Sequence, residues 1–117
     1  MNKKTILIVE ADTDLSDTYR DYFEFQGFEV VGQTYDETKA LELIKKLKPN
    51  LVILDTIIAW HRHSSAIKGL QKLSPRSKIL IITSSDYSLP NDVKVDVFRK
   101  PFSLSKLTKT LYSFSLL

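Results

Sequence analysis

Cysteine is missing from this chain of 117 residues, and glycine, proline and methionine are scarce, with three, four and one residue. Without cysteine the protein has no disulfide framework, no thiolate nucleophile and no cysteine-ligated zinc. No apolar run approaches the roughly 18 residues of a membrane-spanning helix. The apolar part of the N-terminal stretch MNKKTILIVEAD is only about five residues long, too short for the core of a signal peptide. These absences predict a cytoplasmic protein that does not cross a membrane.

The chain has the size and composition of one ordinary globular domain. It is 43% hydrophobic and 26% charged, and it contains no repeat, low-complexity segment or linker. A chain of this length can enclose a single sizeable core. We therefore expect residues 1–117 to form one domain.

The net charge of +3 conceals an uneven distribution of charge. Three basic and nine acidic residues precede Lys39, whereas fourteen basic and five acidic residues follow from Lys39 onward. Two solvated faces of opposite sign explain this pattern most simply, and such a domain can also attract a copy of itself as a homodimer. A small basic nucleic-acid-binding module is an alternative, but the lysines are spread over several segments without an aromatic platform.

Five short apolar runs indicate β-strands: Thr5–Val9, Phe28–Gly32, Leu51–Leu54, Ile79–Thr83 and Val93–Phe98. The first, third and fourth runs lack alternating polar residues, as do strands that are covered on both faces. The last run alternates and suits an edge strand.

Helical patterns lie between and after these runs. Their expected inner faces are Leu15, Tyr19, Tyr22 and Phe23; Ala40, Ile44 and Leu47; Ile67, Leu70 and Leu73; and Leu104, Leu107, Leu111 and Phe114. Side chains suited to capping a helix N-terminus stand before or at the start of each pattern: Asp12 or Thr13, Asp36, Ser64 and Ser103. Gly27 is a suitable stop for the first helix, and Glu42 and Lys46 are spaced to form an ion pair on the second.

Alternating strands and helices indicate repeated βαβ units, which give a doubly wound α/β fold with a parallel sheet and helices on both faces. One helix is missing from the alternation. Between Thr83 and Val93 the chain reads SSDYSLPND, which has no apolar stripe and contains Pro90. We expect a loop or a single turn there, so that the fourth helix is short or absent.

Polar residues follow several of the predicted strands. Glu10, Ala11 and Asp12 come after the first strand, Asp55 after the third, Thr83 and Ser84 at the end of the fourth, and Lys100 after the fifth. Ligands of open parallel sheets bind outside the carboxyl ends of the strands. Carboxylate oxygens suit Mg²⁺, and a lysine beside them suits a phosphoryl group.

Four segments in this order, ILIVEAD, PNLVILD, ILIITSS and FRKPF, give the chain a strong resemblance to a known family. It resembles the response-regulator receiver domains of two-component signalling, the CheY-like superfamily, over essentially its whole length. The resemblance implies a flavodoxin-like sheet of five strands in the order 2-1-3-4-5. It also implies a signalling module rather than an enzyme, whose partners are a histidine kinase and an output protein.

The resemblance assigns roles to individual residues. Asp55 matches the carboxylate that accepts a phosphoryl group, Thr83 the hydroxyl that contacts the phosphate, and Lys100 the lysine that pairs with the acceptor. Glu10, Asp55 and the main-chain carbonyl of Ile57 match ligands of Mg²⁺. Without phosphorylation, Asp55 is simply a strand-terminal acid paired with Lys100.

Ala11 departs from the family pattern, because it occupies the second acidic position, whose carboxylate binds the metal directly. Asp12 is a doubtful substitute, since it is better placed to cap the first helix. We therefore expect Mg²⁺ to bind weakly or not at all. The favoured function is an atypical receiver that signals through protein–protein contacts, and the alternative is a competent receiver phosphorylated at Asp55.

Overall fold

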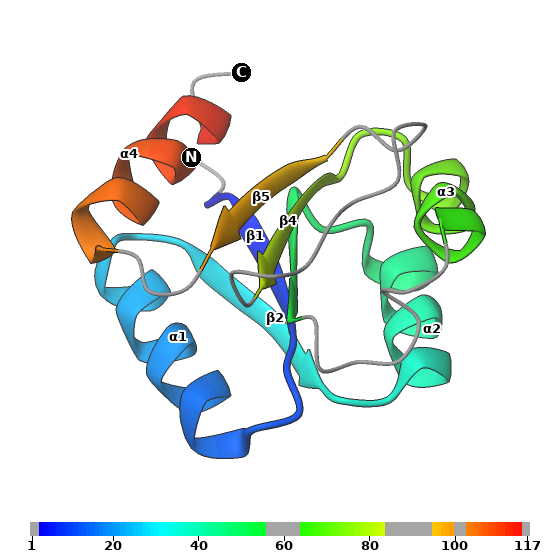
Figure 1. Ribbon diagram of the computed structural model, residues 1–117, viewed down its shortest axis with the longest axis horizontal. Coiled ribbons are helices and arrows are strands. Elements are labelled where there is room, and N and C mark those ends of the chain that lie inside the picture. Colours follow the sequence, from blue (N-terminus) through cyan, green and yellow to red (C-terminus); the bar gives the residue numbers. More distant parts are fainter. Residues whose placement is uncertain (1–2, 56–63, 84–94, 100–102, 116–117) are drawn as a thin grey trace.

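The computed structural model describes residues 3–55, 64–83, 95–99 and 103–115. Strands and helices alternate along most of the chain (Figure 1). In chain order they are β1 Thr5–Val9, α1 Thr13–Phe25, β2 Glu29–Thr34, α2 Glu37–Leu47, β3 Leu51–Asp55, α3 Ser64–Leu73, β4 Lys78–Thr83, β5 Asp96–Arg99 and α4 Leu104–Ser115. Among these described helices, none is both long and apolar enough to span a lipid bilayer.

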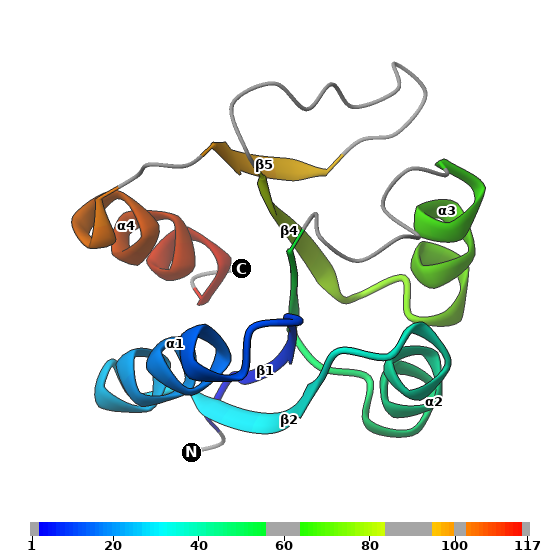
Figure 2. The ribbon, with the colours of Figure 1, turned by 60° about the horizontal axis from the view of Figure 1, so that its bottom comes forward.

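The five strands form one parallel sheet in the order β2-β1-β3-β4-β5. Helices α1 and α4 cover one face of the sheet, and α2 and α3 cover the other (Figure 2). This is the doubly wound, flavodoxin-like architecture that the sequence predicted, and the described residues hold four helices. The stretch expected to be a loop, residues 84–92, lies outside the described residues.

Each face of the sheet carries its own apolar cluster, because successive strand side chains point in opposite directions. On the α2 and α3 side, the cluster contains Leu7, Val9, Ala40, Ile44, Val52, Leu54, Leu70, Ile79 and Ile81. On the α1 and α4 side, it contains Ile6, Ile8, Tyr19, Phe23, Phe28, Leu51, Ile53, Leu80, Ile82, Phe98, Leu107 and Leu111. Strands β1, β3 and β4 are buried on both faces, which explains their unbroken apolar sequences.

Side-chain caps begin three of the four described helices where the sequence predicted them, and the side chain of the fourth candidate, Ser64, lies outside the described part of the chain. The carboxylate of Asp12 accepts a hydrogen bond from the Leu15 amide at 3.1 Å, and that of Asp36 accepts one from the Thr38 amide at 3.0 Å. At the start of α4, the Ser103 hydroxyl accepts from the Lys106 amide at 3.2 Å. After α1 the chain turns at Gly27, whose φ of 95° strongly favours glycine.

The structure corrects several local predictions. Leu47 and Leu73 are 39% and 36% exposed, and each is the last residue of its helix, where fewer neighbouring side chains cover it. Glu42 lies 3.8 Å from Lys39 rather than pairing with Lys46, as expected for exposed pairs that water readily exchanges. The last strand begins at Asp96, so Val95 precedes it.

Candidate functional site

Glu10, Asp55 and Thr83 lie at the carboxyl ends of three adjacent strands. Val9 in β1 pairs with Leu54 in β3, so Glu10 and Asp55 continue those two strands side by side. Asp55 in turn pairs with Ile82, which places Thr83 one residue beyond it on β4. Neighbouring strands are only about 4.8 Å apart, so these residues share one small region of the rim. The structure therefore brings together three of the residues that the sequence selected.

The three side chains are almost completely buried, with exposed fractions of 2% for Glu10, 1% for Asp55 and 0% for Thr83. One carboxylate oxygen of Glu10 accepts a hydrogen bond from the Asp12 amide at 3.0 Å, which fixes the turn between β1 and α1. The Oγ1 atom of Thr83 has no hydrogen-bond partner within the described chain. An unsatisfied buried hydroxyl costs about 1–3 kcal/mol, so this group is available to a ligand at the rim.

Tyr19 on α1 belongs to the electrostatic environment of these acids. Burial raises the pKa of its phenol above the ordinary value, and the negative charges of Glu10 and then Asp55 raise this pKa further. The phenol therefore stays protonated at neutral pH. The apolar pattern of α1 predicts only a core position for Tyr19. The sequence signal for its second role is that Tyr19 lies on the inner face of the helix that follows Glu10.

Ala11 and Asp12 supply no further oxygen to this buried group. Ala11 is exposed and carries only a methyl group, and Asp12 is exposed while its Oδ1 caps α1. Within the part of the chain that the structure describes, no three acidic or histidine side chains are grouped closely enough to hold a metal ion. The two carboxylates at the ends of adjacent strands, Glu10 and Asp55, are the described oxygen donors that could hold Mg²⁺. Ile57 and Lys100, the other two predicted site residues, lie outside the described residues.

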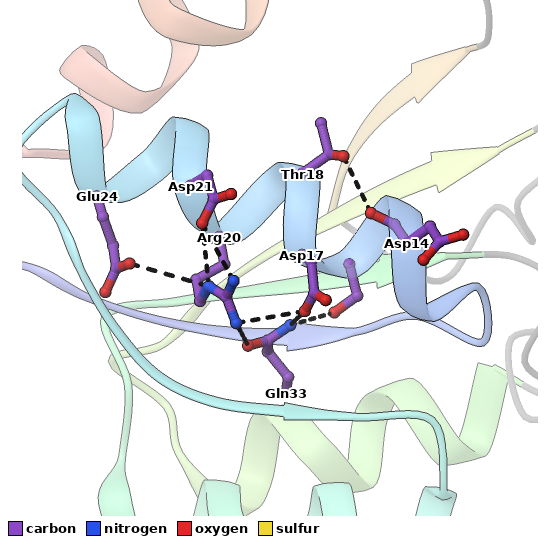
Figure 3. A network of polar contacts seen from close by, with 8 residues as sticks. Asp14, Asp17, Thr18, Arg20, Asp21, Glu24 and Gln33 are labelled. Atoms are coloured by element: carbon purple, nitrogen blue, oxygen red, sulfur yellow. Dashed lines mark hydrogen bonds and ion pairs between the residues drawn. The ribbon is translucent and has the colours of Figure 1, made fainter.

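A polar network beside the rim holds α1 against β2 (Figure 3). The Arg20 guanidinium donates to Gln33 at 3.1 Å and forms ion pairs with Asp17 at 3.3 Å and Asp21 at 3.1 Å. The Gln33 amide donates to the buried hydroxyl of Ser16 at 2.8 Å and to Asp17 at 2.9 Å. No local sequence pattern indicates this network, because Gln33 and Arg20 meet only when the helix packs on the strand.

Comparisons with known proteins agree with this geometry. The family model for the response regulator receiver domain matches residues 6–112. The chemotaxis protein CheY of Thermotoga maritima is 27% identical over 117 residues, covering 96% of this chain and 98% of that protein. The regulator BvgA of Bordetella pertussis is 32% identical over 84 residues, which cover 72% of this chain but only 40% of BvgA.

Solved structures show the same fold. The receiver domain from Methylobacillus flagellatus superposes with a TM-score of 0.83 over 97% of this chain and 99% of that chain, at 20% sequence identity. A response regulator from Thermotoga maritima gives a TM-score of 0.76 with 97% and 98% coverage, also at 20% identity.

Proposed function

Because this chain belongs to the response-regulator receiver family of two-component signalling, we propose that it is an atypical receiver, phosphorylated weakly or not at all at Asp55. Response regulators interact with histidine kinases and output domains, and receivers of this family typically bind Mg²⁺. They are signalling modules rather than classical enzymes. A receiver that loses efficient phosphorylation keeps its protein contacts, so such contacts would carry its signal.

The observation that supports this proposal is the hydrogen bonding of Asp12. Its carboxylate caps α1 from an exposed position, while Ala11 beside it has no oxygen to offer. A metal ion bound to Asp12 Oδ1 would compete with the cap, which typically contributes about 1 kcal/mol to stability. Phosphoryl transfer needs a metal to offset the charge on the phosphate oxygens. Weak metal binding would therefore make phosphorylation slow.

The remaining roles follow the family pattern and are part of the proposal. Asp55 is the phosphoacceptor position, Thr83 the hydroxyl that would contact a phosphoryl group, and Lys100 the counter-ion of Asp55. Glu10, Asp55 and the Ile57 carbonyl are the atoms that would hold any Mg²⁺. The burial of Asp55 and the available hydroxyl of Thr83 favour the alternative of a competent receiver, so an experiment has to separate the two.

Beryllofluoride, which mimics a phosphoryl group on an aspartate, separates the two functions. We expect NMR amide shifts near Asp55 and Thr83 to be small and far from saturation at low millimolar Mg²⁺. Asp55→Asn serves as the control, because it removes the attachment point with little change in shape. Large saturable shifts in the wild type that vanish in Asp55→Asn would establish the competent receiver instead.

A further inference from the structure

A second hollow lies at the other end of the sheet, where the strands begin. It is a pocket of about 310 Å³ between the starts of β1, β3 and β4 and the last turns of α4. Its apolar lining comes from the exposed Pro75 and from the edges of four side chains in the cluster under α1 and α4, Ile6, Phe28, Leu51 and Leu111, each at most 8% exposed. This volume is at the lower end of the range for small-molecule sites. The pocket is separate from the rim that holds Asp55.

Basic side chains line the mouth of this pocket. Lys4, Arg76 and Lys78 come from three separate segments, and none of them forms an ion pair with an acid in the described chain. A neighbouring hollow adds Lys3 and the only nearby acid that lines either one, Glu29. Four cations against one acid give the described lining of these two hollows an excess of three positive charges, which favours an anion.

Hydrogen bonds fix the walls of the pocket in place. The Asn50 side chain accepts from the Thr5 amide at 2.8 Å and from the Thr5 hydroxyl at 3.1 Å, joining the starts of β3 and β1. The buried hydroxyls of Ser74 and Ser77 contact each other at 2.6 Å, and Ser77 also donates to the Pro49 carbonyl. The turn that carries Arg76 is therefore tied to the chain before β3. A site with fixed walls loses little entropy when it binds.

We propose that this pocket binds a soluble amphipathic anion. Its ring-sized or acyl body would pack on Pro75 and the exposed edge of Phe28, and its carboxylate, sulfonate or phosphate would lie between Lys4, Arg76 and Lys78. The apolar lining discriminates against a simple inorganic anion, and the three cations discriminate against a neutral apolar molecule. This inference goes beyond the proposed signalling function and does not depend on it.

Anilinonaphthalene sulfonate is a suitable probe, because it combines an aromatic body with one sulfonate and fluoresces when shielded from water. We expect saturable binding to the folded protein, with NMR amide shifts centred on Thr5, Asn50 and residues 74–78. N-phenyl-1-naphthylamine, the same body without the sulfonate, is expected to bind at least about tenfold more weakly, a difference of about 1.4 kcal/mol.

A charge-matched pair of variants tests the basic mouth. Arg76→Gln with Lys78→Gln is expected to weaken binding of the sulfonate by about tenfold and to leave the neutral probe unaffected. Lys45→Gln with Lys46→Gln removes the same charge from exposed positions of α2 that do not line the pocket, and it should leave affinity within about twofold. Thermal melts of all variants verify that each is folded.

Any of the following results would overturn this proposal. The two double variants could lose equal affinity for the sulfonate probe, the charged and neutral probes could bind with equal affinity, or the amide shifts could lie elsewhere in the protein. A dimer in sedimentation whose contacts cover the same amides without any probe would assign the pocket to a second copy instead. Binding to phosphatidylglycerol vesicles without saturable binding of the monomeric probe would assign it to a lipid surface.

Discussion

Replacing Ala11 with aspartate is expected to restore much of the missing metal affinity. Two unit charges about 4 Å apart interact by about 4 kcal/mol at an effective dielectric constant of 20. Mg²⁺ is divalent, but in the wild type water takes the place of the missing oxygen, so we estimate a net gain of about 2–3 kcal/mol. At about 1.4 kcal/mol for each factor of ten, Mg²⁺ should bind roughly thirtyfold to a hundredfold or more tightly in Ala11→Asp.

The same substitution should lower stability when no metal is present. Glu10 and Asp55 are already buried at the ends of adjacent strands, and a third carboxylate beside them adds repulsion between like charges. Bound Mg²⁺ would reverse the effect, because a ligand at a hundred times its Kd stabilises the folded state by about 2.7 kcal/mol. The melting temperature of Ala11→Asp should therefore fall below that of the wild type without metal and rise with added Mg²⁺.

Calorimetric titration with Mg²⁺ at constant ionic strength measures the affinities, and thermal melts measure the stabilities. Ala11→Asn is the matched control, because it adds nearly the same shape without the negative charge. It should gain far less affinity than Ala11→Asp and should lose little stability. Equal Mg²⁺ affinities in the wild type and Ala11→Asp would refute the idea that the site lacks one carboxylate.

Three further predictions concern the fold and the rim. Asp12→Ala should cost about 1 kcal/mol, seen as a drop of about 4 °C in melting temperature, because it removes the cap of α1; an unchanged Mg²⁺ affinity would confirm that Asp12 is no ligand. Leu107→Ala should lower the free energy of unfolding, measured in urea, by about 2–5 kcal/mol because Leu107 is fully buried. Leu47→Ala, at a position 39% exposed, should change it by no more than about 0.5 kcal/mol. Similar losses of stability in the two variants would contradict the burial of α4. The raised pKa of Tyr19 predicts that stability falls at high pH. An unfolded tyrosine ionises near its ordinary pKa of 10.0, whereas folded Tyr19 stays neutral. The contribution of Tyr19 to the free energy of unfolding is therefore complete below pH 10 and is lost as the pH rises toward the higher pKa of the folded state. In thermal melts from pH 8 to 11, the melting temperature of Tyr19→Phe should decline less steeply than that of the wild type. Identical slopes in the two proteins would argue against the effect.

The sequence alone was enough to predict the architecture, because each level of the pattern agrees with the others. Unbroken apolar runs marked β1, β3 and β4, which are covered on both faces, and the caps at Asp12, Asp36 and Ser103 lie where they were expected. These features depend on residues within a few positions of one another, which is why local reasoning finds them. The polar residues at the strand ends could be chosen for the same reason, since the carboxyl ends of parallel strands share one edge.

Tertiary packing decided what local patterns could not. Whether Leu47 and Leu73 are buried depends on what packs against the ends of α2 and α3, and helical periodicity gives the direction of a side chain but not its neighbours. The influence of Glu10 and Asp55 on Tyr19 likewise depends on how α1 lies across the sheet. The pocket beside Arg76 brings together side chains from segments up to about a hundred residues apart in the chain, so no window of sequence contains it. A sequence records which residues are neighbours along the chain, whereas sites and charges act through space and are defined only once the layers have packed.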